Sequence, residues 1–421
     1  MKYPKNICLL LIFAMLFSIA TQQVYAKDYV IGEHKVPVTK PDPASTYVGS
    51  EKCKTCHMEK YNDWKTSGHP YKLNTPAEEQ AFNSPPIPAP DGYTYNDIYL
   101  VIGGWGWKSR YMDINGYIIT KTGANRDKNG SNQYNIATKQ WVDYKPGQTL
   151  KFDCGNCHTT GYSLAGNKDN KKGIVGTWEE KSIGCEACHG PGSVHVAKGG
   201  GKGVGIIHNE SAAVCGACHT RGADDTKIIA KDGKFIDHHE QYPELLNSPH
   251  KGLNCVQCHD PHKGTHNGQT NPTEGASIKA QCSTCHAQQD ADFTGSTMQK
   301  AGVECADCHM PDTGESAVGD AAKFKGDIAT HLFKINTDPN AKFFDDAGKF
   351  ANGYLTLDWV CLNCHNDENK AWAGQYAKGI HKFVKAEATA TAKPAPTPKT
   401  PAFEALLAIS ALLVAVLVRR R

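Results

Sequence analysis

Hydrophobic side chains are scarce in this sequence for its length. They make up 39% of the 421 residues, whereas the chain contains 40 Gly and 22 Pro. A chain of this length normally folds as two or three domains, each with a packed core of its own. Because the aliphatic content is thin, a component other than side chains is expected to fill part of the interior.

Cysteine is almost absent outside one repeated motif. Of the 17 Cys, all but Cys8 belong to eight copies of Cys-x-x-Cys-His, and Cys8 lies in a segment expected to be removed. No thiol is therefore left for a disulfide bond or a nucleophile. Zinc knuckles are disfavoured as an alternative, because tetrahedral zinc needs a fourth ligand and no second Cys-x-x-Cys pairs regularly with each motif.

The repeated motif is the attachment signal of c-type haem. Its thiols form thioethers with the haem vinyl groups, and its histidine binds the iron from the proximal side. The sequence therefore predicts eight covalent haem c groups, each with its iron. The attachment residues are Cys53, Cys56, Cys154, Cys157, Cys185, Cys188, Cys215, Cys218, Cys255, Cys258, Cys282, Cys285, Cys305, Cys308, Cys361 and Cys364. The proximal ligands are His57, His158, His189, His219, His259, His286, His309 and His365.

The second axial position decides whether a haem conducts electrons or binds a substrate. Eleven His lie outside the motifs, and eight would close every iron. His195 and His262 follow motif histidines too closely to reach the far face of the same haem, so each is predicted to serve a neighbouring one. The predicted distal ligands are His69, His195, His239, His250, His262, His331 and His381, with the eighth open among His34, His208, His238 and His266.

Both ends of the chain carry targeting features. Residues 1 to 26 combine a basic start, an apolar run and small residues before a cleavage point after Ala26, which predicts a secretory signal peptide. Residues 385 to 401 form a stalk rich in Ala, Thr, Pro and Lys. Residues 402 to 421 are just long enough to span a bilayer, with Arg419 to Arg421 kept cytoplasmic; a buried core helix is the alternative.

No strong positive charge remains for nucleic acid. The net charge of +3 includes five positive charges at the removable ends, so residues 27 to 418 carry −2 before the haem propionates are counted. A basic stripe is absent, and nucleic acid is excluded as a partner. Other redox proteins or extracellular electron acceptors are the expected partners.

The expected fold is that of a multihaem cytochrome c, with short helices and loops wrapped on a stack of haems and little regular secondary structure. Residues 27 to 48 are predicted to be an N-terminal arm. Residues 49 to 245 and 246 to 384 are predicted to form two four-haem domains. Within the first, alternating aromatic and polar residues around Asn115-Gly116 predict a small β-hairpin subdomain near residues 90 to 145.

Several stretches resemble one family of extracellular multihaem cytochromes. They are Tyr47-Val48-Gly49-Ser50, Ser67-Gly68-His69-Pro70-Tyr71-Lys72, the hairpin region from Ile102 to Thr120, Cys154 to Gly161, and Cys188-His189-Gly190-Pro191-Gly192-Ser193. Over residues 45 to 250 the chain is similar to the OmcE-type cytochrome nanowires. The resemblance implies polymerisation in which one subunit's histidine, here His34, ligates a haem of the next. Pro401-Ala402-Phe403-Glu404 and the terminal arginines resemble archaeal PGF-CTERM-type sorting tails, which implies surface attachment.

These observations predict an octahaem cytochrome that transfers electrons at or outside the cell surface, with no catalytic residues. The competing hypothesis is an octahaem reductase or oxidoreductase with one open haem that acts on a nitrogen or sulfur oxyanion. The Cys-x-x-Cys-Lys motif typical of pentahaem nitrite reductases does not occur. Carbon monoxide binding or a high-spin iron would favour the enzyme.

Overall fold

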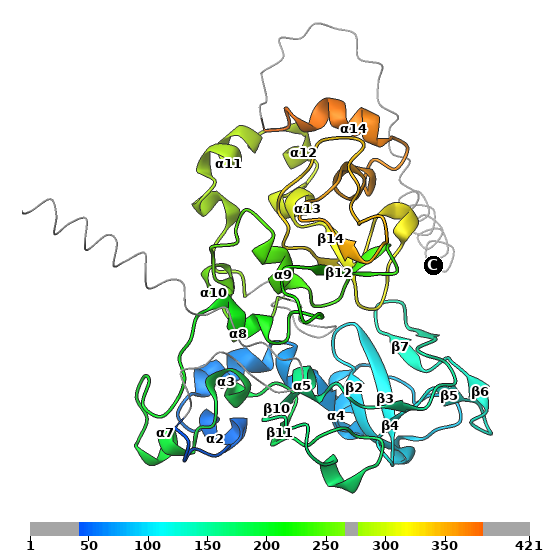
Figure 1. The fold of residues 1–421 in the computed structure, drawn as a ribbon, viewed down its shortest axis with the longest axis vertical. Helices are drawn as coiled ribbons and strands as arrows, with labels where there is room; N and C mark the ends of the chain where they lie inside the picture. Colours follow the sequence, from blue (N-terminus) through cyan, green and yellow to red (C-terminus); the bar gives the residue numbers. More distant parts are fainter. Residues whose placement is uncertain (1–41, 266–276, 382–421) are drawn as a thin grey trace, which may run out of the picture. The chain divides into compact units, whose positions relative to one another are not determined.

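The computed structural model describes residues 42 to 265 and 277 to 381 (Figure 1). The predicted signal peptide, most of the N-terminal arm with His34, residue His266, the stalk and the C-terminal segment lie outside the described residues. The described residues contain no helix that is both long and apolar enough to cross a membrane. All of them belong to one contact unit, which ends at His381.

The helices are short, as the haem-motif spacing predicts. The longest are α3 (Met58–Lys65) and α14 (Lys370–Ala377), with 8 residues each. Helix α4 (Pro76–Phe82) begins at a capping box in which the Thr75 hydroxyl accepts a hydrogen bond from the Glu78 amide. The other helices are α2 (Ser50–Lys54), α5 (Gly155–His158), α6 (Cys185–His189), α7 (Ser193–Ala197), α8 (Ala212–Gly216), α9 (Gln241–Leu246), α10 (Cys255–Cys258), α11 (Ala287–Phe293), α12 (Thr297–Lys300) and α13 (Cys305–His309). Single helical turns are η1 (His69–Tyr71), η2 (Tyr95–Asp97), η3 (Lys168–Asn170), η4 (Cys282–Thr284), η5 (Ala321–Lys323) and η6 (Asp358–Leu362).

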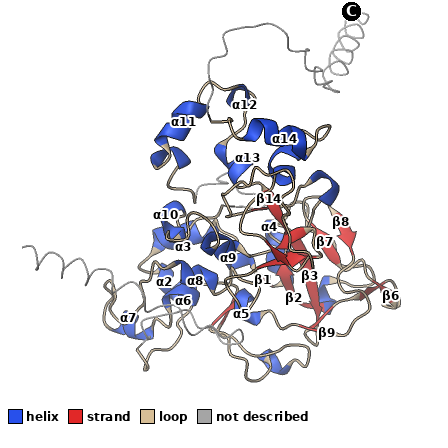
Figure 2. Ribbon diagram, turned by 45° about the horizontal axis from the view of Figure 1, so that its top comes forward, coloured by secondary structure: helices blue, strands red, loops and turns tan. Residues whose placement is uncertain are grey.

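The predicted β-hairpins form a seven-stranded antiparallel sheet (Figure 2). Asn115-Gly116 makes the tight turn between its third and fourth strands, with Gly116 at a φ of 84° that favours glycine. The strands are β1 (Leu73–Asn74), β2 (Ile98–Gly103), β3 (Lys108–Asp113), β4 (Tyr117–Ile118), β7 (Gln133–Asn135), β8 (Gln140–Val142) and β9 (Leu150–Lys151). Beside it, β5 (Lys121–Thr122) and β6 (Lys128–Asn129) form a separate hairpin.

Both faces of this sheet are buried, because its side chains alternate between two hydrophobic clusters. Leu100, Ile102 and Met112 belong to one cluster, whereas Val101 and Tyr111 belong to the other. Alternation of this kind gives the sheet a hydrophobic core built from its own side chains, against one side of which the motif residue Cys154 packs. This sheet is therefore the part of the chain that folds most like an ordinary globular domain.

A second sheet lies in the C-terminal half, where the sequence predicted little sheet. Its order is β15 (Ile328–Ala329), β14 (Asp312–Glu315), β13 (Phe235–Asp237), β12 (Ile228–Lys231) and β16 (Phe350–Ala351). A two-stranded pair, β10 (Thr159–Thr160) and β11 (Glu180–Lys181), is also present. Strands of two to four residues are too short to carry a recognisable alternation, which is why the sequence did not reveal them.

Polar contacts connect the seven-stranded sheet to the loop beside β14. The Trp107 indole donates to the Asp327 carbonyl at 3.2 Å, and the Asn135 amide donates to the Ala317 carbonyl at 2.9 Å. The Lys108 ammonium donates to the Ser316 carbonyl. The Asp327 carboxylate in turn accepts three backbone N–H groups from residues 316 to 318, which holds that loop in place.

Candidate haem-binding sites

Each described Cys-x-x-Cys-His motif lies on a helical turn. The N–H of the motif histidine donates to the carbonyl of the first cysteine, for example at 2.9 Å in His57 to Cys53 and in His365 to Cys361. Residues one helical turn apart share a face, so both thiols and the imidazole can reach one flat group. All sixteen motif cysteines are free thiols, and none is buried. These sites fit covalent haem.

Six motif histidines face a second imidazole at a narrow range of spacings. Two imidazoles that bind one metal from opposite sides have ring centres about 6 Å apart, because each metal–nitrogen bond is about 2 Å long. The observed centre-to-centre distances are 6.2 Å for His57–His195, 6.2 Å for His189–His262, 6.1 Å for His259–His331, 5.8 Å for His250–His286, 5.8 Å for His309–His381 and 5.5 Å for His219–His239. Each pair therefore leaves room for one iron.

The outer nitrogen of several of these imidazoles is held by a backbone carbonyl. His189 Nδ1 lies 2.8 Å from the Ile207 oxygen, and His309 Nδ1 lies 2.7 Å from the Phe333 oxygen. His195 Nδ1 lies 2.9 Å from the Val204 oxygen. A carbonyl at Nδ1 keeps the proton there and leaves Nε2 free as the metal-binding atom.

Two motif histidines lack such a partner. Neither His158 nor His365 has a second imidazole at the pair spacing within residues 42 to 265 and 277 to 381. The nearest ring to His365 is Trp372, whose centre is 5.0 Å away. That distance is too short for a haem to lie between the two rings, so Trp372 packs directly against His365. Trp372 therefore does not occupy the second axial position of this site.

His69, the remaining predicted distal residue, lies near this network without forming a clear pair. It is close to His219 and His262, and desolvation lowers its pKa to about 3. His239 lies near His158 as well as His219. His219 therefore has two candidate partners. Of the alternatives for the eighth ligand, His208 is exposed beside Glu210, and His238 Nδ1 contacts Asp237 at 2.8 Å.

Cationic side chains gather around the second motif, Cys154 to His158. Burial lowers the pKa of His158 to about 3, and the charges of Lys72, His238 and Arg110 lower it further. Burial raises the pKa of the Cys154 thiol to about 11, whereas the charges of Arg110 and Arg221 lower it. Lys72, Arg110 and Arg221 come from three separate segments of the chain, and His238, whose pKa burial lowers to about 4, is neutral at neutral pH. The cluster was not predicted from the sequence, where no local charge run signals it.

Cysteines of different motifs lie side by side and so reveal the order of the sites. Numbering the motifs from one to eight along the chain, side chains come within hydrogen-bonding reach at Cys53–Cys185, Cys157–Cys218, Cys215–Cys255 and Cys282–Cys305. Cys188 lies near enough to Cys218, Cys258 to Cys282, and Cys308 to Cys361 for their charges to interact. The motifs thus follow the order one, three, four, five, six, seven, eight, with motif two branching from motif four.

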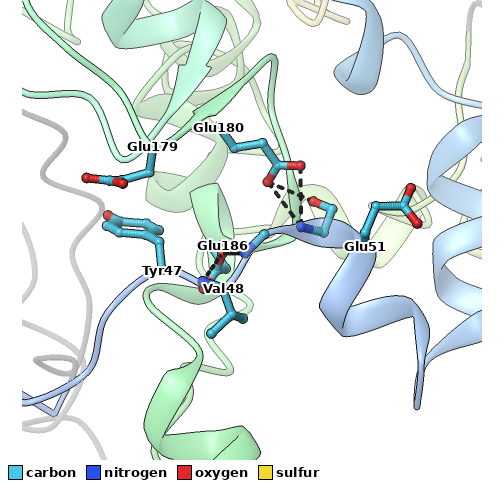
Figure 3. A pocket seen from close by; sticks show the side chains of 8 residues that line it. Tyr47, Val48, Glu51, Glu179, Glu180 and Glu186 are labelled. Carbon is cyan, nitrogen blue, oxygen red and sulfur yellow. Dashed lines mark hydrogen bonds between the residues drawn. The ribbon is translucent and has the colours of Figure 1, made fainter.

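The segment before the first motif is held against the third motif by two carboxylates (Figure 3). Glu186, inside the third motif, accepts backbone N–H groups of Val48 at 3.0 Å and Gly49 at 2.8 Å. Glu180 accepts the Ser50 hydroxyl at 2.9 Å. These residues line a pocket with Tyr47, Glu51 and Glu179. Because the carboxylates are occupied by backbone donors, the pocket is a docking point for the chain itself.

Comparison with known proteins places these sites in a family. Residues 52–85 and 120–190 match the model of cytochrome c554 and c-prime, and residues 247–291 match the doubled CXXCH motif. The chain is a multihaem c-type cytochrome. Its cofactor is haem c, held by the Cys-x-x-Cys-His motifs.

Two curated proteins are similar in sequence. The dissimilatory sulfite reductase MccA of Wolinella succinogenes is 22% identical over 81% of this cytochrome and 64% of its own length. The multiheme cytochrome MtrA of Shewanella baltica is 27% identical over 38% of this cytochrome and 45% of its own length. The cytochrome thus spans less than two thirds of either relative.

A solved structure shares the fold. The octaheme sulfite reductase MccA of Wolinella succinogenes superposes with a TM-score of 0.56 at 19% identity, over 80% of this cytochrome and 66% of that chain. The predicted architecture of short helices, loops and small sheets is therefore confirmed.

Proposed function

We propose that the protein is an octahaem cytochrome that carries electrons along a continuous row of haems. The observation that carries this proposal is the closeness of cysteines of successive sites. A thioether marks the edge of its haem, so cysteines in contact bring haem edges together. The row leads from the first motif to the eighth without a break, and haem c supplies the one-electron chemistry along it.

The paired imidazoles support the same function. An iron closed on both sides by histidine exchanges electrons with little rearrangement and leaves no position for a substrate. Six sites offer such a pair, namely those of His57, His189, His219, His259, His286 and His309. In each pair the second histidine comes from outside the motif, which ties neighbouring sites into one rigid unit.

Mass spectrometry and voltammetry of the secreted protein test this proposal. Mass spectrometry should find eight haem groups on each chain, and film voltammetry should show all of them exchanging electrons with one electrode. A protein with fewer haems, or with a group of haems that the electrode cannot reduce, would contradict the continuous row.

A second function is favoured by the second motif, and we propose that it binds and reduces a small oxyanion. His158 lacks a second imidazole at the pair spacing among the described residues, and Arg110, Arg221, Lys72 and His238 surround the motif. Arg110 and Arg221 lie near Cys154, at the vinyl edge of the haem, and so are not placed to neutralise the propionates at the opposite edge. The branch position suits an end point for electrons, and a relative bears the name sulfite reductase.

Carbon monoxide distinguishes a closed site from an open one. The fully reduced protein should bind carbon monoxide. Sulfite or nitrite should oxidise the reduced protein, with loss of the ferrous absorption bands. Reduced protein that binds no carbon monoxide and is not oxidised by either anion would restrict the function to electron transfer.

The site of His365 suggests how the row ends. No second imidazole at the pair spacing faces it among the described residues, so we propose that an imidazole from outside them, His34 or His266, or one from a second copy of the chain, completes it. Ligation by a second copy would build a filament similar to the OmcE-type nanowires. Electron microscopy of the secreted protein should then show filaments, and a population of monomers alone would contradict polymerisation.

The sequence features at the ends of the chain support secretion and surface attachment. We propose that residues 1 to 26 direct export and that residues 402 to 421 anchor the protein at the cell surface, directly or after exchange for a lipid as in PGF-CTERM-type tails. Electrons would then pass to other redox proteins or extracellular acceptors. Fractionation of cells should recover the haem protein with the surface, and truncation at residue 384 should release it into the medium.

A further inference from the structure

One imidazole of the network faces a buried carboxylate. Glu244, on α9, is 3% exposed, and its Oε2 accepts the backbone N–H of His331 at 2.6 Å. The same oxygen lies 3.8 Å from His331 Nδ1. That nitrogen is buried and has no hydrogen-bond partner in the structure. Glu244 therefore places a buried negative charge beside the outer nitrogen of His331 without a direct hydrogen bond to it.

His331 belongs to one of the pairs that fit an iron. Its ring centre lies 6.1 Å from that of His259, the histidine of the fifth motif. If Nε2 binds iron, Nδ1 carries the proton and points to the Glu244 side of the ring. A full negative charge 3.8 Å from this proton stabilises positive charge on the imidazole and its iron through space, and burial leaves that charge poorly screened.

We infer that Glu244 is a positioning residue that lowers the reduction potential of the haem at the fifth motif. A more basic imidazole stabilises ferric iron over ferrous iron, and the buried negative charge acts in the same direction. The paired histidines His195 and His309 are held by carbonyls and lack this effect. His262 Nδ1 lies 3.4 Å from Asp260, but that carboxylate is more exposed to solvent than Glu244, so its charge is better screened. The inference rests on one part of the proposed function, namely that His259 and His331 bind the same iron.

The place of the fifth motif in the row of haems determines how its lowered reduction potential affects electron transfer. The fifth motif meets the fourth at Cys215 and Cys255, and it lies near the sixth at Cys258 and Cys282. It is thus the link between the first four sites and the last three. A low-potential haem there holds an electron poorly, so it passes charge between the two groups while retaining little itself.

Substitution Glu244→Gln tests the inference in the complete secreted protein. Glutamine keeps the shape and an oxygen that can accept the His331 N–H, but it removes the charge. In a spectroelectrochemical titration one component should move to higher potential, by a tenfold change in its ferric-to-ferrous ratio, or about 59 mV. The electron paramagnetic resonance signal of one low-spin haem should shift with it. Glu79→Gln is the matched control, because the buried Glu79 side chain accepts hydrogen bonds from the hydroxyl groups of Ser109 and Tyr95 and does not lie beside an imidazole of a pair.

The outcomes separate this inference from the proposed function. A full set of haems with no component displaced in Glu244→Gln would overturn the role of Glu244 and leave electron transfer intact. Absence of low-spin signals from the unsubstituted protein would overturn the shared iron itself. If Glu244→Gln does not accumulate, Glu244→Asp should move the same component upward by less, because its carboxylate is one methylene further from Nδ1; an unmoved component again overturns the inference.

Discussion

The imidazoles of His189 and His262 lie 6.2 Å apart and within 7° of parallel, although they belong to segments far apart in the sequence. His262 follows the fifth motif, whereas His189 closes the third. The pair therefore fastens the loop after one motif across the site of another. If both bind one iron, removing either should open a single site.

Substitution His262→Ala should create one additional open iron. The third site would lose its second imidazole, so the reduced protein should take up one more equivalent of carbon monoxide than the unsubstituted protein, with a new high-spin ferric signal. His208→Ala is the control, since His208 lies on the surface beside Glu210 and pairs with no motif histidine. Unchanged uptake in His262→Ala would show that His262 is not a ligand.

Substitution Arg221→Gln should weaken anion binding at the second motif. Arg221 is exposed and lies near Cys154, where its charge would attract sulfite or nitrite. Loss of a charged hydrogen-bond donor reduces affinity by about tenfold. Spectral titration of the ferric protein with sulfite measures this. Lys227→Gln is the control, because that exposed lysine pairs with Asp224 and does not lie among the cations of the second motif. Equal affinities in the two variants would argue against an anion site.

The buried carboxyl of Glu79 should make stability depend on pH. Burial raises its pKa from 4.5 to about 7, against the opposing effect of hydrogen bonds from Ser109, Tyr95 and Tyr111. The folded chain therefore holds this proton more tightly than the unfolded chain. The contribution of Glu79 to the free energy of unfolding is highest below pH 4.5. It falls as the pH rises from 4.5 to 7 and is constant above, with a total loss of at most about 3 kcal/mol.

Glu79→Gln should remove that part of the pH dependence. Glutamine is uncharged at every pH, and its amide can donate to Tyr95, whose hydroxyl still donates to the Ile87 carbonyl. Denaturant unfolding at pH 5 and pH 8 should show a smaller difference in the variant than in the unsubstituted protein. An identical difference in both would mean that Glu79 ionises normally.

Substitution Glu186→Ala should release the segment before the first motif. Glu186 is 2% exposed and also accepts the Gly192 N–H at 2.7 Å, so its loss leaves three backbone donors without a partner. We expect a destabilisation of about 3 kcal/mol and faster limited proteolysis near Tyr47. Glu179→Ala should leave the cleavage rate unchanged, because that exposed carboxylate lines the same pocket without holding the backbone. Equal cleavage of both variants would contradict the docking.

The first sheet and the motifs were predictable because their signals are local. Asn115-Gly116 sets a turn by backbone conformation alone, and a Cys-x-x-Cys-His turn holds its three side chains within five residues. The second sheet was not predictable, since β13 and β14 pair across a long stretch of chain through only two residue pairs, Ile236 with Gly314 and Asp237 with Glu315. The cation cluster at His158 and the carboxylate at His331 were missed for the same reason.

The sequence by itself determined the chemistry of this protein: haem c, its points of attachment, and a supply of histidines large enough to close most irons. Covalent attachment needs only neighbours along the chain, so a linear pattern is sufficient to specify it. Which histidine faces which, the branch at the second motif and the contact of Glu244 with His331 were decided by tertiary structure. These contacts join segments that lie far apart in the sequence, and only the packing of the folded chain sets the distances between them.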